Sequence, residues 1–402
     1  MKPNPSKAAY YTLEGLNSFA TAYFFNYLLQ RLKREAAWSD FEILALCVVH
    51  GVLYVPFSWY GGRFGQRHGY FASLRVGFGG MLAAVVLAGL VPATWAQVLG
   101  LAVWTATMCF TWPVLEALVS EHEDPGHLPA RVGLYNVVWA GTAAAGVFFG
   151  GTLYRRLGPA SLYWLPALVH LAQFLVLGPL KRRHDAWLAI APPVPSHAAA
   201  AAADPRKPRY FLRLAWIGNP FNYMAVNTLL AMVPAIGVKV GVSIEQVGWL
   251  MSLWYITRTL GFLVLWFWPG WHYHFGWFLA AFLTLLASFT TLLVTHAIWV
   301  LVVAQVFFGA ASALLYYSAL FYTMDGSDTK GAHGGIHEAF IGLGIFGGPA
   351  VSTAAVALTG RPESPAWAIG LFLAAGAALA VGIRLRHGRN GRARPAAASV
   401  VA

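Results

Sequence analysis

The chain is a succession of long apolar stretches separated by short polar connections. Each stretch has roughly the 20 residues that an α-helix needs to cross a bilayer. Backbone groups need hydrogen bonds in hydrocarbon, so these stretches must be helical, and the shorter alternating segments of a membrane β-barrel are absent. The pattern predicts twelve spanning helices, at residues 10–30, 41–61, 71–92, 96–119, 131–153, 159–180, 210–234, 244–268, 273–295, 297–322, 334–358 and 364–384.

Composition agrees with this interpretation. Of 402 residues, 58% are hydrophobic and only 10% are charged, and the mean hydropathy is +0.59. A soluble domain carries roughly 25% charged residues, so this chain has too few to cover a surface that faces water. Cys47 and Cys109 both fall inside predicted spans, and we interpret them as buried packing residues rather than as a disulfide.

The distribution of basic residues predicts how the chain is oriented. The formal net charge is +12, but the basic residues gather at span ends and tails, which indicates membrane orientation rather than nucleic acid binding. If both termini are cytoplasmic, 19 lysines and arginines lie on that side and 7 on the other. Because cytoplasmic loops are rich in lysine and arginine, we expect cytoplasmic termini in the cell (inner) membrane. The first outer loop, Arg31 to Arg34, runs against this trend.

An internal repeat in the sequence predicts that the protein has two similar halves. Sliding the sequence on itself by 202 residues superposes the six earlier spans on the six later ones and pairs Asn17 with Asn219. The segment between them is rich in proline, alanine and basic residues, which is typical of an exposed connector. Two parallel repeats of six spans are a known transporter plan. The predicted parts are an N-terminal bundle at 1–180, a cytoplasmic linker at 181–209 and a C-terminal bundle with a basic tail at 210–402.

The connection between the second and third spans carries a recognisable motif. Residues 62–70 resemble the signature loop of the major facilitator superfamily, G-x-x-x-D-R-x-G-R-[KR]. Gly62, Arg67 and Gly69 match, whereas Gln66 stands where the family has its aspartate and Tyr70 replaces a basic residue. A tight glycine turn with orienting arginines would also explain these residues. With the repeat and the span count, the resemblance covers the whole chain. It implies an all-α membrane protein with twelve transmembrane helices in two pseudo-symmetric six-helix bundles.

The fifth span is rich in glycine, and this has two explanations. Gly146, Gly150 and Gly151 resemble the G-P-x-x-G-G element of the proton-coupled antiporters of the superfamily, without its proline. Small residues also let membrane helices approach closely, which would explain the same glycines as packing positions.

In this family the first, fourth, seventh and tenth spans line a central cavity. Helical spacing places polar and aromatic side chains on one face of each of these spans, and a wall of aromatic and amide groups suits amphipathic or hydroxylated solutes. Each aromatic residue, taken singly, is also explained by packing or lipid contact. The candidates for solute binding or coupling in these spans and the eleventh are Glu14, Asn17, Trp104, Trp112, Glu116, Asn219, Tyr223, Asn227, Gln305, Tyr316 and Glu338.

Arg258 is a further candidate, because it lies near the middle of the eighth span. A charged side chain at that depth is costly, so it must pair with an acid or face an aqueous cavity. Glu14, Glu116 and Glu338 are the possible partners. A fixed salt bridge and the binding of an anionic solute both remain open.

These features together predict a secondary transporter that works by alternating access. The nucleotide-binding sequence G-x-x-x-x-G-K-[ST] is absent, so we do not expect direct use of ATP. A proton or solute gradient would drive transport, and the protonatable groups within the spans favour a proton. The cargo is expected to be a small solute, either an exported amphipathic compound or an imported sugar or small organic anion. The alternative class is a non-transporting sensor or scaffold. An enzyme is not expected, because no convergent catalytic groups appear, and neither is a cofactor, a metal or an oligomer.

Overall fold

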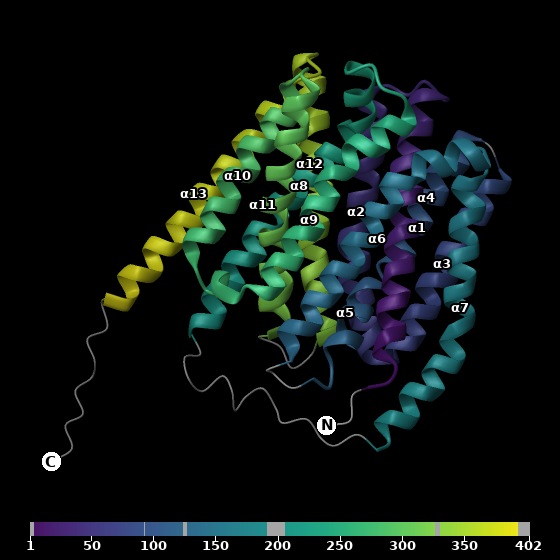
Figure 1. The fold of residues 1–402 in the computed structure, drawn as a ribbon, viewed down its shortest axis with the longest axis vertical. Helices are drawn as coiled ribbons and strands as arrows, with labels where there is room; N and C mark the ends of the chain where they lie inside the picture. Colours follow the sequence, from purple (N-terminus) through teal and green to yellow (C-terminus); the bar gives the residue numbers. More distant parts are fainter. Residues whose placement is uncertain (1–3, 92, 124–126, 191–205, 326–329, 393–402) are drawn as a thin grey trace.

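The computed structural model describes residues 4–91, 93–123, 127–190, 206–325 and 330–392, which form helices and no strand (Figure 1). A short 3-10 helix, η2 (Pro269–Trp271), joins two of them. The α-helices are α1 (Lys7–Arg34), α2 (Asp40–His68), α3 (Tyr70–Leu90), α4 (Thr94–Met108), α5 (Trp112–Ser120), α6 (Leu128–Leu157), α7 (Ser161–Leu188), α8 (Arg206–Lys239), α9 (Ile244–Phe267), α10 (Phe275–Val294), α11 (Ile298–Asp325), α12 (Lys330–Thr359) and α13 (Ser364–Arg392).

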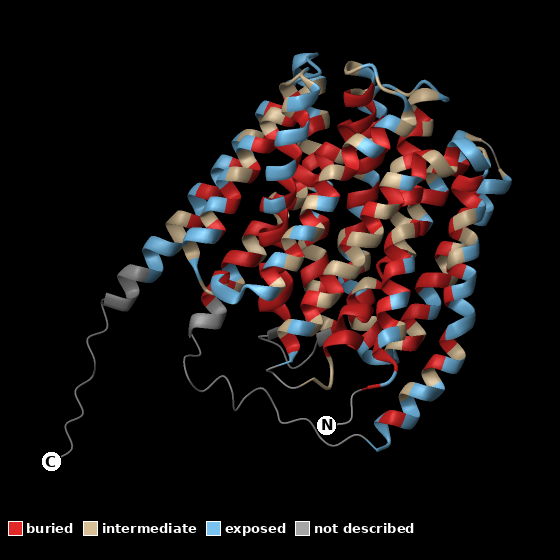
Figure 2. Ribbon diagram, viewed as in Figure 1, coloured by how far each residue is buried: buried red, intermediate tan, exposed pale blue. Residues whose placement is uncertain are grey.

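The outer surface of the bundle is apolar. Large side chains such as Leu90, Leu175 and Phe267 are 75%, 64% and 72% exposed, and Figure 2 shows exposed positions on the outer faces with buried ones between the helices. Eleven helices of the described residues, with α4 and α5 counted as one, are long and apolar enough to cross a bilayer. A surface of this kind suits lipid. The predicted all-helical membrane fold is therefore confirmed.

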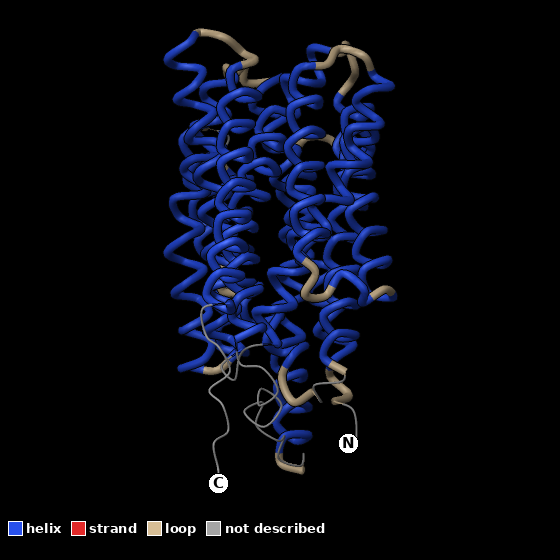
Figure 3. Tube along the Cα trace, turned by 90° about the vertical axis from the view of Figure 1, so that its left-hand side faces the viewer, coloured by secondary structure: helices blue, strands red, loops and turns tan. Residues whose placement is uncertain are grey.

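The first span is the least apolar. α1 has 28 residues and lies along the height of the bundle (Figure 1), but it is not one of the eleven apolar helices. Glu14, Asn17 and Gln30 interrupt its apolar sequence, and all three side chains are buried. They are buried against protein because α1 packs on α6 and α7. With α1, the described residues contain the twelve spans that were predicted, all aligned with the long axis (Figure 3).

The fourth span is broken near its middle. The sequence predicts one helix over 96–119, whereas α4 ends at Met108 and α5 begins at Trp112. Pro113 lies in the first turn of α5, the position where a helix tolerates a residue without a backbone N–H. Asn17 holds the break in place, because its Nδ2 donates a hydrogen bond of 3.1 Å to Oγ1 of Thr111.

The two sets of six spans repeat one another. Corresponding helices begin 199 to 205 residues apart, close to the offset of 202 found in the sequence. We call α1–α7 the first half and α8–α13 the second half; they lie side by side in Figure 1. The halves meet mainly through α2 with α12 and through α6 with α9. The repeat relates one of these pairs to the other, so the interface has approximate twofold symmetry.

The signature segment is mostly helical, which differs from the loop expected over 62–70. α2 continues to His68 and α3 begins at Tyr70, so Gly69 alone forms the connection, with φ of +93°. A glycine adopts this conformation without strain. Nothing before Gly69 interrupts the helix, so Gly62 lies inside α2 and Arg67 is exposed in its last turn.

Most of the predicted linker lies outside the described residues. α7 remains helical to Leu188 and α8 begins at Arg206, so both helices extend into the predicted linker of residues 181–209. Residues 191–205 are not described. The division of the chain into residues 1–180, 181–209 and 210–402 therefore stays a prediction.

Candidate functional site

A cavity of about 140 Å³ lies between the two halves. Its wall is formed by α1, α2, α4, α5 and α6 of the first half and by α8, α9, α11 and α12 of the second. The lining is mainly aromatic and aliphatic, with a few amide and ionisable groups. Binding sites for small molecules typically have this composition.

The structure brings most of the sequence-predicted candidates to this cavity. Four others are buried in the helices but do not line it: Asn17, Glu116, Asn219 and Gln305. The motif residues Gly62, Arg67 and Gly69 are not part of the wall either. The candidates that line the cavity are Glu14, Trp104, Trp112, Tyr223, Asn227, Arg258, Tyr316 and Glu338.

Several aromatic residues of the wall are absent from the sequence-based candidates. Phe25 belongs to α1, and the others, on α2, α6 and α9, are Tyr54, Tyr135, Trp139, Trp254 and Tyr255. Helices α2, α6 and α9 are the second, fifth and eighth spans, whereas the candidates were sought mainly on the first, fourth, seventh and tenth. One signal was available in the sequence. Trp254 precedes Arg258 by four positions, so the two share a helix face.

Arg258 is surrounded by aromatic rings. It is 3% exposed, and its guanidinium carbon lies 4.5 Å from the ring centre of Trp139, 4.7 Å from that of Trp254 and 5.1 Å from that of Tyr255. These are cation–π distances. No salt bridge joins Arg258 to a carboxylate in the described residues, and its Nε has no hydrogen-bond acceptor among them. The guanidinium thus retains unused capacity for an anion.

Glu14 is a buried acid in the wall formed by α1. It is 1% exposed, and its Oε1 accepts a hydrogen bond of 2.7 Å from Oγ of Ser18, one turn away. Its Oε2 has no donor among the described residues. The side chain therefore lines the cavity and has one carboxyl oxygen without a donor in the described part of the chain.

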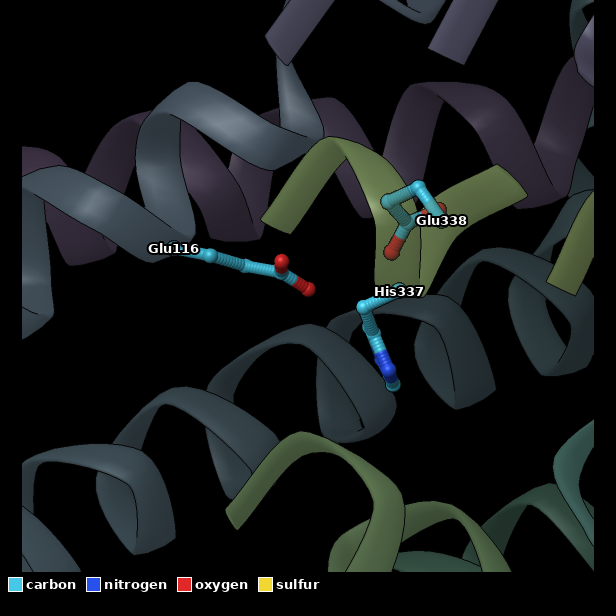
Figure 4. A group of neighbouring side chains, drawn as sticks. All are labelled: Glu116, His337 and Glu338. Atoms are coloured by element: carbon cyan, nitrogen blue, oxygen red, sulfur yellow. The ribbon is translucent and has the colours of Figure 1, made fainter. Parts of the chain in front are cut away.

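A second group of ionisable side chains lies beside the cavity, where α5 meets α12. Figure 4 shows Glu116 extending toward His337 and Glu338. One carboxylate or imidazole atom from each lies within 4.8 Å of those of the other two, and all three residues are buried. In the described part of the chain, no donor reaches either oxygen of Glu116, and both ring nitrogens of His337 lack a partner. We call these three residues the Glu116 cluster.

Tyr54 connects the Glu116 cluster to α2. Its hydroxyl donates a hydrogen bond to Oε2 of Glu338. Tyr54 belongs to the first half and Glu338 to the second. A hydrogen bond to a carboxylate fixes its orientation, so this contact holds the Glu338 side chain in place between the two halves.

At one end of the molecule, which we call the terminal end, the halves meet backbone to backbone. This end carries the start of α1 and the start of α12 (Figure 1). A Cβ atom built on Gly62 would lie 2.6 Å from the carbonyl oxygen of Gly331 and 2.6 Å from Cα of Gly335. Only glycine permits this approach, so α2 and α12 are in direct contact here.

Polar contacts join the halves at the other end, which we call the opposite end. Glu245 at the start of α9 binds Nε of Arg155 at 2.8 Å and accepts a hydrogen bond of 2.7 Å from Oγ1 of Thr152. Arg34 at the end of α1 donates to the carbonyl oxygen of Val242 at 3.1 Å. The two halves are therefore in contact at both ends of the molecule.

Comparison with known proteins agrees with this architecture. Among solved structures, the crystal structure of the human organic anion transporter MFSD10 (TETRAN) is similar, with a TM-score of 0.66 and 14% sequence identity over 95% of this chain and 100% of that chain. At this identity the likeness shows the fold alone. No curated protein sequence matches the chain significantly. The sequence model described as Major Facilitator Superfamily matches residues 11–219, half of the chain. With its twelve helical spans in two repeated halves, this chain belongs to the Major Facilitator Superfamily and is a membrane transporter.

Proposed function

We propose that the protein is a secondary active transporter that moves a small amphipathic organic anion by alternating access. The observation that carries this proposal is Arg258, a buried cation in the wall of a cavity between two repeated halves. Aromatic rings surround it, and no acid of the described residues is paired to it. Contacts join the two halves at both ends of the molecule. In alternating access, the contacts at one end separate while those at the other end hold, and solute enters or leaves at the open end.

The chemistry of the cavity defines the kind of cargo. A carboxylate or sulfonate can pair with the guanidinium of Arg258 through parallel hydrogen bonds. Trp104, Trp112 and Tyr316 supply flat apolar surfaces for the rest of the solute, and Asn227 supplies a directed hydrogen bond. The similar structure, MFSD10, is named an organic anion transporter, which agrees with this assignment. Sugars lack a charge for Arg258 to bind and fit the cavity less well.

The anion site is tested in proteoliposomes with matched solute pairs. We expect Arg258→Gln to reduce uptake of an aromatic carboxylate at least tenfold, because an ion pair in a water-poor site is lost. Uptake of the corresponding uncharged amide should change much less. Arg75→Gln removes an exposed arginine from α3 and serves as the control. Equal transport of both solutes by wild type and by Arg258→Gln would refute the assignment.

The proposed driving force is a proton gradient, with Glu14 as the proton carrier. Glu14 faces the cavity with one free carboxyl oxygen, whereas the other acid of the wall, Glu338, is engaged by Tyr54. A carboxyl group that binds a proton from one side and releases it to the other couples proton flow to the movement of the halves.

Coupling and exchange can be measured separately. Glu14→Gln keeps the shape of the side chain but cannot bind or release a proton. We expect it to abolish solute accumulation driven by an imposed pH gradient while exchange of labelled for unlabelled solute continues. Accumulation at the wild-type level would contradict the role of Glu14. The sign of the pH gradient that drives accumulation also distinguishes export of amphipathic compounds from uptake.

The proposed setting is the cell membrane, with the protein acting as a monomer and both termini in the cytoplasm. The excess of lysine and arginine on the side of the termini supports this orientation. The terminal end of the bundle would then face the cytoplasm. Accessibility of a single cysteine introduced at exposed His68 in α2 to an impermeant reagent tests it, because only permeabilised cells should be labelled.

A further inference from the structure

The Glu116 cluster contains more unsatisfied polar atoms than its surroundings explain. Glu116 is 1% exposed, Glu338 4% and His337 0%. Both oxygens of Glu116 and both nitrogens of His337 lack a hydrogen-bond partner among the described residues. Buried polar groups in proteins nearly always have a partner. A shared proton or a bound ion would satisfy some or all of these atoms.

A divalent metal ion matches the chemistry of these three side chains. Two carboxylates and one imidazole are the oxygen and nitrogen ligands that first-row divalent ions accept. Two carboxylate charges also balance the charge of one such ion, which matters because unpaired charge is costly inside a membrane. A shared proton is the competing explanation, since Glu116 and Glu338 can bond to each other only if one of them is protonated. A single proton would still leave the nitrogens of His337 without a partner.

The spacing of the cluster is close to that of a metal site. Tetrahedral ligand atoms at about 2.1 Å from a common ion lie roughly 3.4 Å apart, and the three ligand atoms here lie within 4.8 Å of one another. Side-chain rotations that move the ligand atoms by about an ångström would bring them to an ion. Tyr54 acts as an outer partner, because its hydroxyl bonds one oxygen of Glu338 and leaves the other available.

We propose that Glu116, His337 and Glu338 form a binding site for a divalent transition-metal ion such as Zn²⁺ or Mn²⁺. The ligands come from both halves, Glu116 from α5 and the other two from α12. The helices are close at this point, since a Cβ built on Gly334 would lie 3.1 Å from the carbonyl oxygen of Pro113 and 3.2 Å from Oε2 of Glu116. A bound ion joins α5 to α12 and stabilises the arrangement that is closed at the terminal end.

This proposal goes beyond transport of an organic anion and is tested without any solute. Purified protein is treated with a chelator, and its thermal unfolding is followed as Zn²⁺ or Mn²⁺ is added. At 100 times Kd, a ligand that binds only the folded protein should raise the melting temperature by about 3 °C for a chain of this size. Co²⁺ serves as a spectroscopic probe, because coordination by protein ligands strengthens its visible absorption.

Matched variants locate the site. Glu116→Gln and His337→Gln should lose both the shift in melting temperature and the Co²⁺ spectrum. Glu14→Gln and His50→Gln change another buried acid and another buried histidine of the cavity wall, and both should keep the metal response. The wild-type Co²⁺ spectrum remains informative if a variant fails to fold.

The outcomes that overturn the proposal are distinct from those that overturn transport. No change in melting temperature and no Co²⁺ spectrum in the wild type would show that the cluster does not bind such an ion. An equal response in wild type and Glu116→Gln would place the ion elsewhere. Neither result affects the assignment of Arg258, which is measured by solute flux.

Discussion

Substitution of Gly62 by alanine should separate the two halves at the terminal end. The added Cβ would lie 2.6 Å from both the carbonyl oxygen of Gly331 and Cα of Gly335, whereas ordinary contacts begin at 3.4 Å. The contacting atoms are backbone, so no side chain can rotate away. α2 and α12 must move apart by about 0.8 Å, the difference between these two distances.

The energetic cost of the added methyl group applies only to the arrangement that is closed at the terminal end. Overpacking of a well-packed contact costs about 1–3 kcal/mol, and this cost disappears once the terminal end opens. The equilibrium between closed and open should therefore shift toward open by about 5- to 150-fold. Alanine also favours a helix over glycine by about 1 kcal/mol, an effect that is the same in both arrangements.

The shift from the closed to the open arrangement can be measured by double electron–electron resonance between two spin labels. Spin labels at exposed His68, the end of α2, and exposed Phe267, the end of α9, report the separation of the halves at the terminal end. Gly382→Ala is the control, because a Cβ there meets nothing within 4 Å. We expect longer distances for Gly62→Ala only. A distribution that matches wild type and Gly382→Ala would show that backbone contact does not close this end.

Two further substitutions test other contacts. Glu245→Gln weakens the ion pair with Arg155, whose side chain is 66% exposed. Exposed ion pairs contribute about 0.2–1 kcal/mol, so spin labels at the opposite end should show a small shift toward the open arrangement. A shift toward closure would contradict the role of this ion pair. Gln173→Ala removes an amide that donates to an α1 carbonyl oxygen and bonds His170. Leaving these buried groups unpaired should cost about 1–3 kcal/mol of folding free energy. Gln173→Ala should therefore unfold at a lower temperature than the control Thr12→Ala, which changes an exposed residue. Equal unfolding temperatures would refute the stabilising role of Gln173.

The spans were predictable because the bilayer imposes a length on apolar stretches. Hydropathy does not report how far a helix continues beyond the membrane, and so α2 was expected to end before Gly62 but extends to His68. It also does not report interruptions within an apolar stretch. Pro113 was the visible signal for the break between α4 and α5, and its effect depends on whether it begins a new helix turn.

The candidate site was predictable only where a residue is unusual for its own span. Arg258 and Glu14 are of this kind, since a charged group within an apolar helix is informative by itself. The Glu116 cluster is different. Glu116 and His337 are more than 200 residues apart in the chain, and their proximity depends on how α5 and α12 are aligned. Helix periodicity says nothing about that alignment.

The polarity of α1 has a consequence for how the protein is made. Glu14 is an acid of the cavity wall, and Asn17 holds the break in the fourth span. The same two polar residues make α1 the span with the weakest tendency to enter a membrane. A carboxylate at the centre of a lone helix costs about 2.5–3.5 kcal/mol during insertion, and Glu14, two turns from the start of α1, bears part of that cost. α2, with a mean hydropathy of 1.8, can offset this cost if the two helices insert together. We therefore expect biosynthesis to proceed through an α1–α2 hairpin, with α1 secured in the bilayer only after α6 and α7 have been synthesised and cover its polar face.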